Sequence, residues 1–416
     1  MIDSIKETIY QTLRRGQKYT QTDNVYLAKY GGYLMASNAV IALSAFLLSV
    51  AFAHFLPKEI YGQYRFLLSA FNLLTIFTLQ SMNRAVTQSI ARGHDGVMQD
   101  ALKTKLRWGF WGGLIGLGAA GYYWFFGNHI YAISFLLMAA FLPIMKGAET
   151  YQAFLAGKKL FDKKAKFTAL THLLSAALLI LVLFFSDNLI LIIAAYFASF
   201  SFWRTIFLFY SVKKFQNNRL KDPAMIRYGK HLSLMNILGI AADEVDKILL
   251  YKFLGPAQLA IYAFALAPIQ QIRSPLQTIQ ELALPKLAIQ DGQKIRQELP
   301  KKLLRSLLLI SAIIAFYFLV APYFFRFFYP QYMESVFYSK IFAITLFVFP
   351  ASMMALSMQA KVKTKQLYKI SFITPIVQIG LLVVLIPLWG ILGAILARVT
   401  LQLFYSLLVY YFFRKM

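Results

Sequence analysis

The sequence predicts an all-α membrane protein that crosses the bilayer many times. Of its 416 residues, 59% are hydrophobic, and apolar stretches recur from end to end. These stretches are about 20 residues long, which is the length that a helix needs to cross the hydrocarbon core. The Lys and Arg residues lie in short clusters between the stretches, which is typical of loops in a polytopic membrane protein.

Twelve spans fit this pattern, arranged as two lobes of six helices. The expected spans are 31–53, 64–84, 107–126, 130–154, 167–185, 189–211, 229–253, 258–283, 303–321, 336–358, 370–388 and 391–412. We therefore expect an N-terminal segment over 1–30, a first lobe over 31–211, a basic linker over 212–228 and a second lobe over 229–416. The N-terminal segment is polar and lacks the pattern of a cleaved signal.

Strongly basic loops alternate with nearly uncharged ones. Lys158-Lys159 and Lys163-Lys164 lie in one basic loop, whereas Gly127-Asn128-His129 is short and bare. Because Lys and Arg concentrate in cytoplasmic loops, we expect both termini in the cytoplasm and the chain in the cell inner (plasma) membrane.

Several function classes are excluded or disfavoured by composition and motifs. The net charge of +26 is spread between apolar spans, which argues against nucleic-acid binding. The absence of Cys excludes disulfides and thiolate metal sites, and the five His show no ligand spacing. No Walker loop, nucleophile elbow or metalloprotease signature is present, so we expect no metal, no cofactor and no enzyme activity.

The chain repeats at an offset of 198 residues over its first three spans. The matched pairs include Tyr30-Gly31 with Tyr228-Gly229, Asn38 with Asn236, Tyr64 with Tyr262, Lys103 with Lys301 and Arg107 with Arg305. Matches of Leu and Phe alone would arise by chance in such a composition. An even number of spans in each half makes the repeat parallel, with a pseudo-twofold axis along the membrane normal. Transporters are built in this way, with the site at the interface of the halves.

Short motifs follow the first and seventh spans. The first is Tyr61-Gly62-Gln63-Tyr64, and its counterpart is Asp246 followed by Phe253-Leu254-Gly255 and Tyr262, with Pro285 closing the eighth span. With these motifs, the chain resembles the polysaccharide/O-antigen flippases of the multidrug/oligosaccharidyl-lipid/polysaccharide exporter superfamily.

The resemblance implies a V-shaped pair of lobes that flips an undecaprenyl-diphosphate-linked oligosaccharide to the outer leaflet by alternating access. Lipid II flippases of this superfamily usually carry fourteen spans, so twelve favour the O-antigen, capsule or exopolysaccharide branch. The implied partners are the lipid-linked oligosaccharide, the lipid bilayer, and a polysaccharide polymerase or chain-length regulator. We expect a monomer.

Basic residues inside the spans are candidates for substrate binding, because a charge in hydrocarbon costs about 3 kcal/mol on insertion scales. Arg273 is the lead candidate, since its planar guanidinium can bond a diphosphate bidentately and it lies near the middle of a span. An internal salt bridge is the alternative. The other candidates are Arg65, Arg84, Arg204, Arg398 and Lys146.

Each of these has a structural alternative. Arg65 is close enough to the span end to snorkel, and Arg84 fits the distribution of cytoplasmic charge. Lys146 lies three residues before Glu149, so an internal pair is the favoured interpretation. Arg204 and Arg398 contact either substrate or acids on neighbouring helices.

The acidic residues concentrate in the seventh span as Asp243, Glu244 and Asp246, beside Lys247. Asp243 and Lys247 are spaced to pair on one helix face, which leaves Asp246 and Glu244. Crowded buried carboxylates favour binding of Na⁺ or a proton. The group is therefore either a coupling-ion site or a saturated network that ties helices together. The equivalent first-half positions are uncharged, which confines any such site to the second lobe.

Three rival functions remain. A multidrug or cation exporter of the same superfamily should have an acidic cavity, whereas the other spans carry more basic than acidic residues. A membrane-embedded glycosyltransferase or ligase usually needs large loops or catalytic acids outside the membrane. The outer loops here are tiny, with only Glu59, Asp187 and Glu334. A scaffold would hardly need so many charges in its spans.

Overall fold

The computed structural model describes the backbone of residues 24–289, 292–360 and 364–414, and the side chains of 31–277, 280, 303–359 and 366–414. All regular structure in these ranges is helical. The helices are α2 (Asn24–Phe55), α3 (Lys58–Leu74), α4 (Met82–Ala91), α5 (Val97–Phe125), α6 (His129–Ala148), α7 (Tyr151–Gly157), α8 (Phe161–Phe185), α9 (Leu189–Phe215), α10 (Pro223–Met235), α11 (Ile237–Leu254), α12 (Pro256–Ile289), α13 (Gly292–Phe328), α14 (Ser335–Ala343), α15 (Val348–Ala360) and α16 (Thr364–Arg414). Short 3₁₀ turns η1 (Thr75–Thr78), η2 (Pro330–Tyr332) and η3 (Ile344–Phe347) join some of them.

The prediction of a multi-span helical membrane protein is confirmed. Within the described ranges, seven helices are long and apolar enough to cross a membrane, and an eighth is added if α3–η1 and α4, bent by 49°, form one span. The expected count of twelve is not established by this criterion. Part of the difference lies in α16, which is two helical segments that meet at Gly390, where φ is 58° and ψ is −130°.

Helix ends follow local sequence signals. The side chain of Asn188 accepts hydrogen bonds from the amides of Ile190 and Leu191 at the start of α9. Asp222 caps α10 in the same way, with a proline at the first helical position. Gly255 ends α11 with φ of 84°, a left-handed value that glycine adopts without strain. The next residue, Pro256, starts α12. This helix continues past Pro285 to Ile289, so the proline does not close it, contrary to our expectation.

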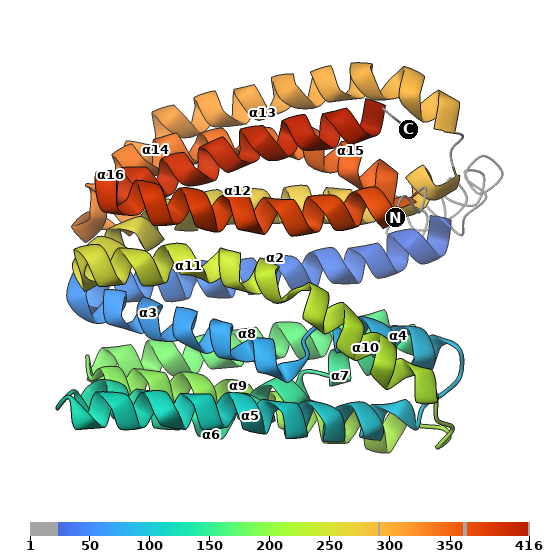
Figure 1. The fold of residues 1–416 in the computed structure, drawn as a ribbon, viewed down its shortest axis with the longest axis horizontal. Helices are drawn as coiled ribbons and strands as arrows, with labels where there is room; N and C mark the ends of the chain where they lie inside the picture. Colours follow the sequence, from blue (N-terminus) through green and yellow to red (C-terminus); the bar gives the residue numbers. More distant parts are fainter. Residues whose placement is uncertain (1–23, 290–291, 361–363, 415–416) are drawn as a thin grey trace, which may run out of the picture.

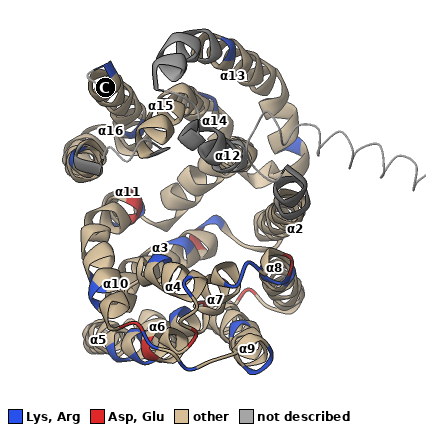
Figure 2. Cartoon of the chain, turned by 90° about the vertical axis from the view of Figure 1, so that its right-hand side faces the viewer, with Lys and Arg blue, Asp and Glu red and all other residues tan. Residues whose placement is uncertain are grey.

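The helices form an elongated bundle in which most run along the long axis (Figure 1). Helices α3 to α9 lie below α12 to α16 in this view, with α2 and α11 between the two groups. The beginning of α2 and the end of α16 lie at the same end of the bundle. Figure 2 looks at that end and shows Lys and Arg distributed over helices of both groups.

The two groups meet where the sequence motifs lie. Tyr61 and Tyr64 of α3 are buried, and so is Tyr262 of α12. Gly62 is required by this packing, because a Cβ there would lie 1.9 Å from the carbonyl oxygen of Pro256. Farther along α3, the ring of Phe66 stacks on that of Tyr251 with centroids 4.0 Å apart. The motifs therefore form part of one interface between the first and second halves of the chain.

The helix bounds agree with the repeat, while the breaks within the helices do not. Shifting α2 by 198 residues gives 222–253, and α10 with α11 covers 223–254. However, α2 is continuous, whereas its counterpart breaks between Met235 and Ile237. The pseudo-twofold relation therefore stays a prediction.

The expected linker is mostly helical. Its non-helical part is 216–222, between α9 and α10. This part packs on the α4–α5 connection, where buried Asp95 accepts hydrogen bonds from the amide of Asn217 at 2.8 Å and from Lys158 Nζ at 2.5 Å. The start of the second half is thus fixed against the first half at the end shown in Figure 2.

Candidate functional site

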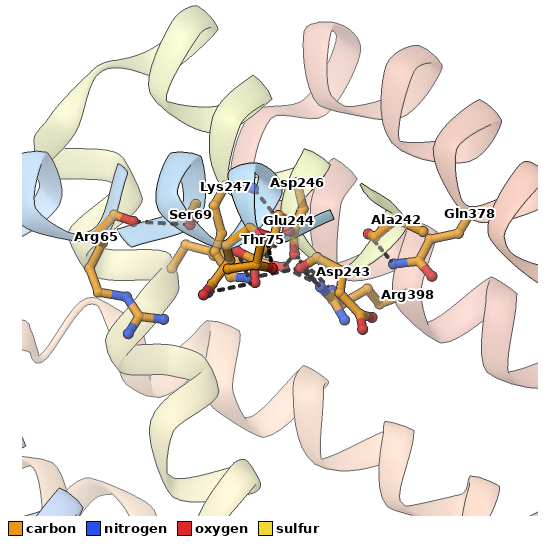
Figure 3. A network of polar contacts seen from close by, with 12 residues as sticks. Arg65, Ser69, Thr75, Ala242, Asp243, Glu244, Asp246, Lys247, Gln378 and Arg398 are labelled. Carbon is orange, nitrogen blue, oxygen red and sulfur yellow. Dashed lines mark hydrogen bonds and ion pairs between the residues drawn. The ribbon is translucent and has the colours of Figure 1, made fainter. Parts of the chain in front are cut away.

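Asp246 of α11 is at the centre of a buried ion-pair network (Figure 3). Its side chain is 0% exposed, and its Oδ2 accepts hydrogen bonds from Arg398 Nε at 2.8 Å and Nη2 at 2.6 Å. Tyr262 of α12 donates a third bond to the same oxygen. Arg398 Nε also donates to the Tyr262 hydroxyl at 3.1 Å. Three helices, α11, α12 and α16, are therefore tied together at this carboxylate.

The expected side-chain pair of Asp243 with Lys247 is wrong. Lys247 Nζ donates to the backbone carbonyl of Asp243 at 2.8 Å and pairs with the carboxylate of Glu244 at 2.7 Å. Glu244 in turn accepts a bond from Asn72 of α3 at 3.1 Å. The network therefore reaches across the interface between the two halves of the chain.

Asp243, rather than Asp246, is the carboxylate left without an ion pair among the described residues. Its side chain is exposed and lines a cavity of about 310 Å³ and an adjoining one of about 500 Å³. The helices around the two cavities are α11, α12, α15 and α16, together with η3, all from the second half. This placement differs from the expected one, since the polar cavity lies within the second half and not between the halves.

Arg273 faces the same cavity from α12. No carboxylate partner or hydrogen bond holds its guanidinium within the described part of the chain, whereas Arg398 on the opposite wall is bound to Asp246. Among the described residues, the alternative of an internal salt bridge therefore applies to Arg398, and Arg273 has no such partner. The cavity combines a guanidinium and a carboxylate that have no ion pair among the described residues with neutral polar side chains.

Those polar side chains were not singled out from the sequence as a set. They are Gln277, Gln280, Gln378, Gln402, Ser352, Thr374 and Tyr405. Their spacing in the sequence would have indicated most of them. Gln277 and Gln280 follow Arg273 at i+4 and i+7, and Gln402 and Tyr405 follow Arg398 at the same spacing. Such a pattern places side chains on one face of a helix.

The first half contains a second cluster of buried charges. Arg204 of α9 donates to Glu149 at 2.6 Å, and Lys146 lies 3.6 Å from the same carboxylate, which confirms the expected pair of Lys146 and Glu149. Lys105 is 2% exposed and donates to Asn83 at 3.1 Å and to Thr150 at 3.2 Å. Lys105 precedes the expected span 107–126, and its burial follows from α5 beginning earlier, at Val97.

Arg65 and Arg84 lie outside both clusters. Arg65 of α3 has a buried Nε without a hydrogen-bond partner, and no contact joins its guanidinium to the network in Figure 3. Arg84 is exposed near the start of α4. The six basic candidates thus divide into paired residues (Arg204, Arg398, Lys146) and residues without an ion pair in the described chain (Arg65, Arg84, Arg273).

A metal centre is not evident. Among the residues that the structure describes, no group of three or more His, Asp or Glu is placed to hold a metal ion.

A match to a protein family model shows to which family the chain belongs. Polysaccharide biosynthesis proteins match residues 27–283, more than half of its length. The chain belongs to this family. No curated protein sequence is significantly similar to it.

Comparison with solved structures shows which fold this chain has. The lipid II flippase MurJ in an inward closed conformation has a TM-score of 0.67 at 14% identity, covering 91% of this chain and 86% of that one. An inward-facing multidrug resistance MATE family transporter of the MOP superfamily also has a TM-score of 0.67, at 13% identity over 92% and 97% of the two chains. An outward-facing MATE transporter follows at 0.63, with 14% identity over 93% and 95%. The chain therefore has the helical fold of MATE and MurJ transporters, as the resemblance of its motifs implied.

Proposed function

We propose that the chain is a flippase that moves an undecaprenyl-diphosphate-linked oligosaccharide from the cytoplasmic to the outer leaflet of the inner membrane. The observation that carries this proposal is the guanidinium of Arg273, which has no ion pair among the described residues, in a polar cavity of a membrane protein from the polysaccharide biosynthesis family. The cargo is an O-antigen, capsule or exopolysaccharide unit. A transport role rather than catalysis is consistent with the transporters that share the fold.

The diphosphate is the part of the cargo that most needs the protein. Its negative charges cannot cross hydrocarbon unaided, and an arginine fork can bond two phosphate oxygens at once. Arg273 is free to do so because no acid holds it in the described chain. Arg65, with its own unsatisfied Nε, is the proposed first-half contact. The membrane potential, negative inside, adds about 2.3 kcal/mol per charge per 100 mV in favour of outward movement of the anion.

The mechanism we propose is alternating access of two six-helix lobes, with twelve spans and both termini in the cytoplasm. The helix count includes the two segments of α16 and treats α3–α4, α6–α7, α10–α11 and α14–α15 as broken spans. The end of the bundle in Figure 2 is the cytoplasmic one in this scheme, because the basic loops belong there. The protein acts as a monomer, with a polymerase or chain-length regulator as its functional neighbours.

Coupling to Na⁺ or a proton is assigned to Asp243. Asp246 and Glu244 are engaged by Arg398 and Lys247, so they already have the partners that a cation would replace. Asp243 faces the cavity and has no such partner among the described residues. A cation bound there is therefore accessible from the same space as the cargo.

The test of the function is deletion of the gene, followed by measurement of lipid-linked glycan on each face of the inner membrane. We expect the lipid-linked glycan to accumulate on the cytoplasmic face and plasmid-borne wild type to reverse this. An unchanged distribution between the two leaflets would contradict the proposal.

A multidrug or cation exporter is the second candidate. The carboxylate of Asp243 in the cavity and the fold shared with MATE transporters favour it. Arg273 and Arg398 on the walls oppose it, since they repel a cationic drug. A drug-susceptibility screen of the deletion strain separates the two candidates. If the protein is an exporter, the deletion strain should become sensitive to drugs, while the distribution of lipid-linked glycan between the two leaflets should not change.

A further inference from the structure

The cavity in the second half has an amide wall that the binding of a diphosphate does not explain. We define the amide wall as Gln277 and Gln280 of α12 with Gln378 and Gln402 of α16. The hydroxyl groups of Ser352, Thr374 and Tyr405 line the same space. An ionised diphosphate only accepts hydrogen bonds, whereas these neutral side chains carry both donors and acceptors, so it would leave their acceptor oxygens without a donor.

Within the described residues, most of the hydrogen-bonding capacity of these amides is unused by the protein itself. Gln378 donates from its Nε2 to the carbonyl of Ala242 at 2.8 Å (Figure 3), and the hydroxyl of Ser352 donates to the carbonyl of Val348 at 2.9 Å. The amides of Gln277, Gln280 and Gln402 make no hydrogen bond within the described residues, and the covered hydroxyl of Thr374 has no partner. Polar groups inside a membrane protein are costly unless they are satisfied, so a polar occupant is expected at this wall.

The chemistry of the wall fits a sugar. Each sugar hydroxyl donates one hydrogen bond and accepts others, and a glutamine amide offers two donors and one acceptor oxygen in return. The cavity volume of about 310 Å³, with the adjoining 500 Å³, is within the range of roughly 300–1,000 Å³ that small-molecule sites occupy. An anionic ligand could accept hydrogen bonds from the amide nitrogens but would offer no donor to the amide oxygens, and an apolar ligand would satisfy neither.

The order of residues on α12 fixes where the sugar would lie. Arg273, Gln277 and Gln280 follow one stripe, about 10 Å long at 1.5 Å per residue. An anionic group at the arginine end can therefore continue directly into a polyhydroxyl group at the amide end. This is the arrangement of a diphosphate attached to its first sugar.

We infer that the amide wall binds the sugar attached to the diphosphate of the lipid-linked cargo, so the second half recognises the glycan as well as the charge. This inference rests on the proposed function. It assigns Gln277, Gln280, Gln378 and Gln402 as glycan-contacting residues, with Arg273 contacting the diphosphate.

The experiment compares two probes on purified protein in lipid nanodiscs. One probe is the lipid-linked oligosaccharide extracted from the deletion strain, and the other is undecaprenyl diphosphate without sugar. Affinities are measured from the shift of the melting temperature with ligand concentration. The variants are Gln277→Leu combined with Gln402→Leu, and the matched control is Gln271→Leu, a glutamine on the same helix that lines a different, apolar groove.

For the wild type and Gln271→Leu, we expect the glycosylated probe to bind more tightly than the bare one. The double variant should bind the glycosylated probe on the order of tenfold more weakly, with the bare probe unchanged. Equal affinities of the two probes in the wild type would overturn the glycan subsite and leave the flippase proposal intact. Failure of the wild type to bind either probe would contradict the flippase proposal itself. An unaltered melting temperature without ligand shows that the double variant is folded.

Discussion

The two halves of the chain both bury an arginine of a late helix against a carboxylate, yet they use their remaining charges differently. In the first half, Arg204 and Lys146 share Glu149, whose side chain is 27% exposed. In the second half, Arg398 holds Asp246, which is 0% exposed and also bonded by Tyr262. The second half then leaves Arg273 and Asp243 facing a cavity. Within the described chain, the paired charges hold helices together, and we propose that Arg273 and Asp243, which have no ion pair there, bind ligands.

The largest effect on stability is expected for Arg398→Leu. It leaves Asp246 buried without its ion pair, which costs about 3–5 kcal/mol for a buried pair. The melting temperature in nanodiscs measures the loss. Combining Arg398→Leu with Asp246→Asn should recover much of it, because the uncompensated charge is then removed. A double variant no more stable than the single one would show that the ion pair is not what holds α11 to α16.

A smaller loss is expected for Arg204→Gln. Glu149 keeps Lys146 at 3.6 Å and reaches solvent, so the free energy of unfolding should fall by about 1–2 kcal/mol. The measurement is the same melting temperature, compared directly with Arg398→Leu. Equal destabilisation of the two variants would show that the deeper burial of the Arg398–Asp246 pair does not make it more important for stability than the Arg204–Glu149 pair.

The smallest effect on stability is expected for Asp243→Asn, within about 0.5 kcal/mol, because no ion pair is lost. Its effect should appear in transport, which should no longer depend on Na⁺ or pH across the membrane. Initial rates of glycan-lipid flipping in proteoliposomes at two pH values, with and without Na⁺, measure this. Dependence that persists in Asp243→Asn and disappears in Asp246→Asn would return the coupling role to Asp246.

The sequence predicted the class of fold but not which charged side chains pair, and the role of Arg273 stays a prediction. Apolar length and basic loops identify spans without any knowledge of packing, and the helix bounds follow from caps such as Asn188 and Asp222. Arg398 pairs with Asp246 across 152 residues of sequence, which no local spacing encodes. The local rule for Asp243 and Lys247 failed because Lys247 could reach a backbone carbonyl and Glu244 instead. The amide wall was not predicted because its members come from two helices that are distant in sequence, although the spacing within each helix places its polar side chains on one face.

The central claim is that the unpaired arginine of the second half carries the diphosphate. The most direct measurement is the rate at which proteoliposomes flip the lipid-linked oligosaccharide, for Arg273→Gln against Arg326→Gln, an exposed arginine of α13 outside the cavity. Both variants should be as stable as the wild type. We expect Arg273→Gln to lower the rate at least about tenfold, through the loss of a charge-assisted bond, and Arg326→Gln to leave it unchanged. A wild-type rate for Arg273→Gln would contradict the account.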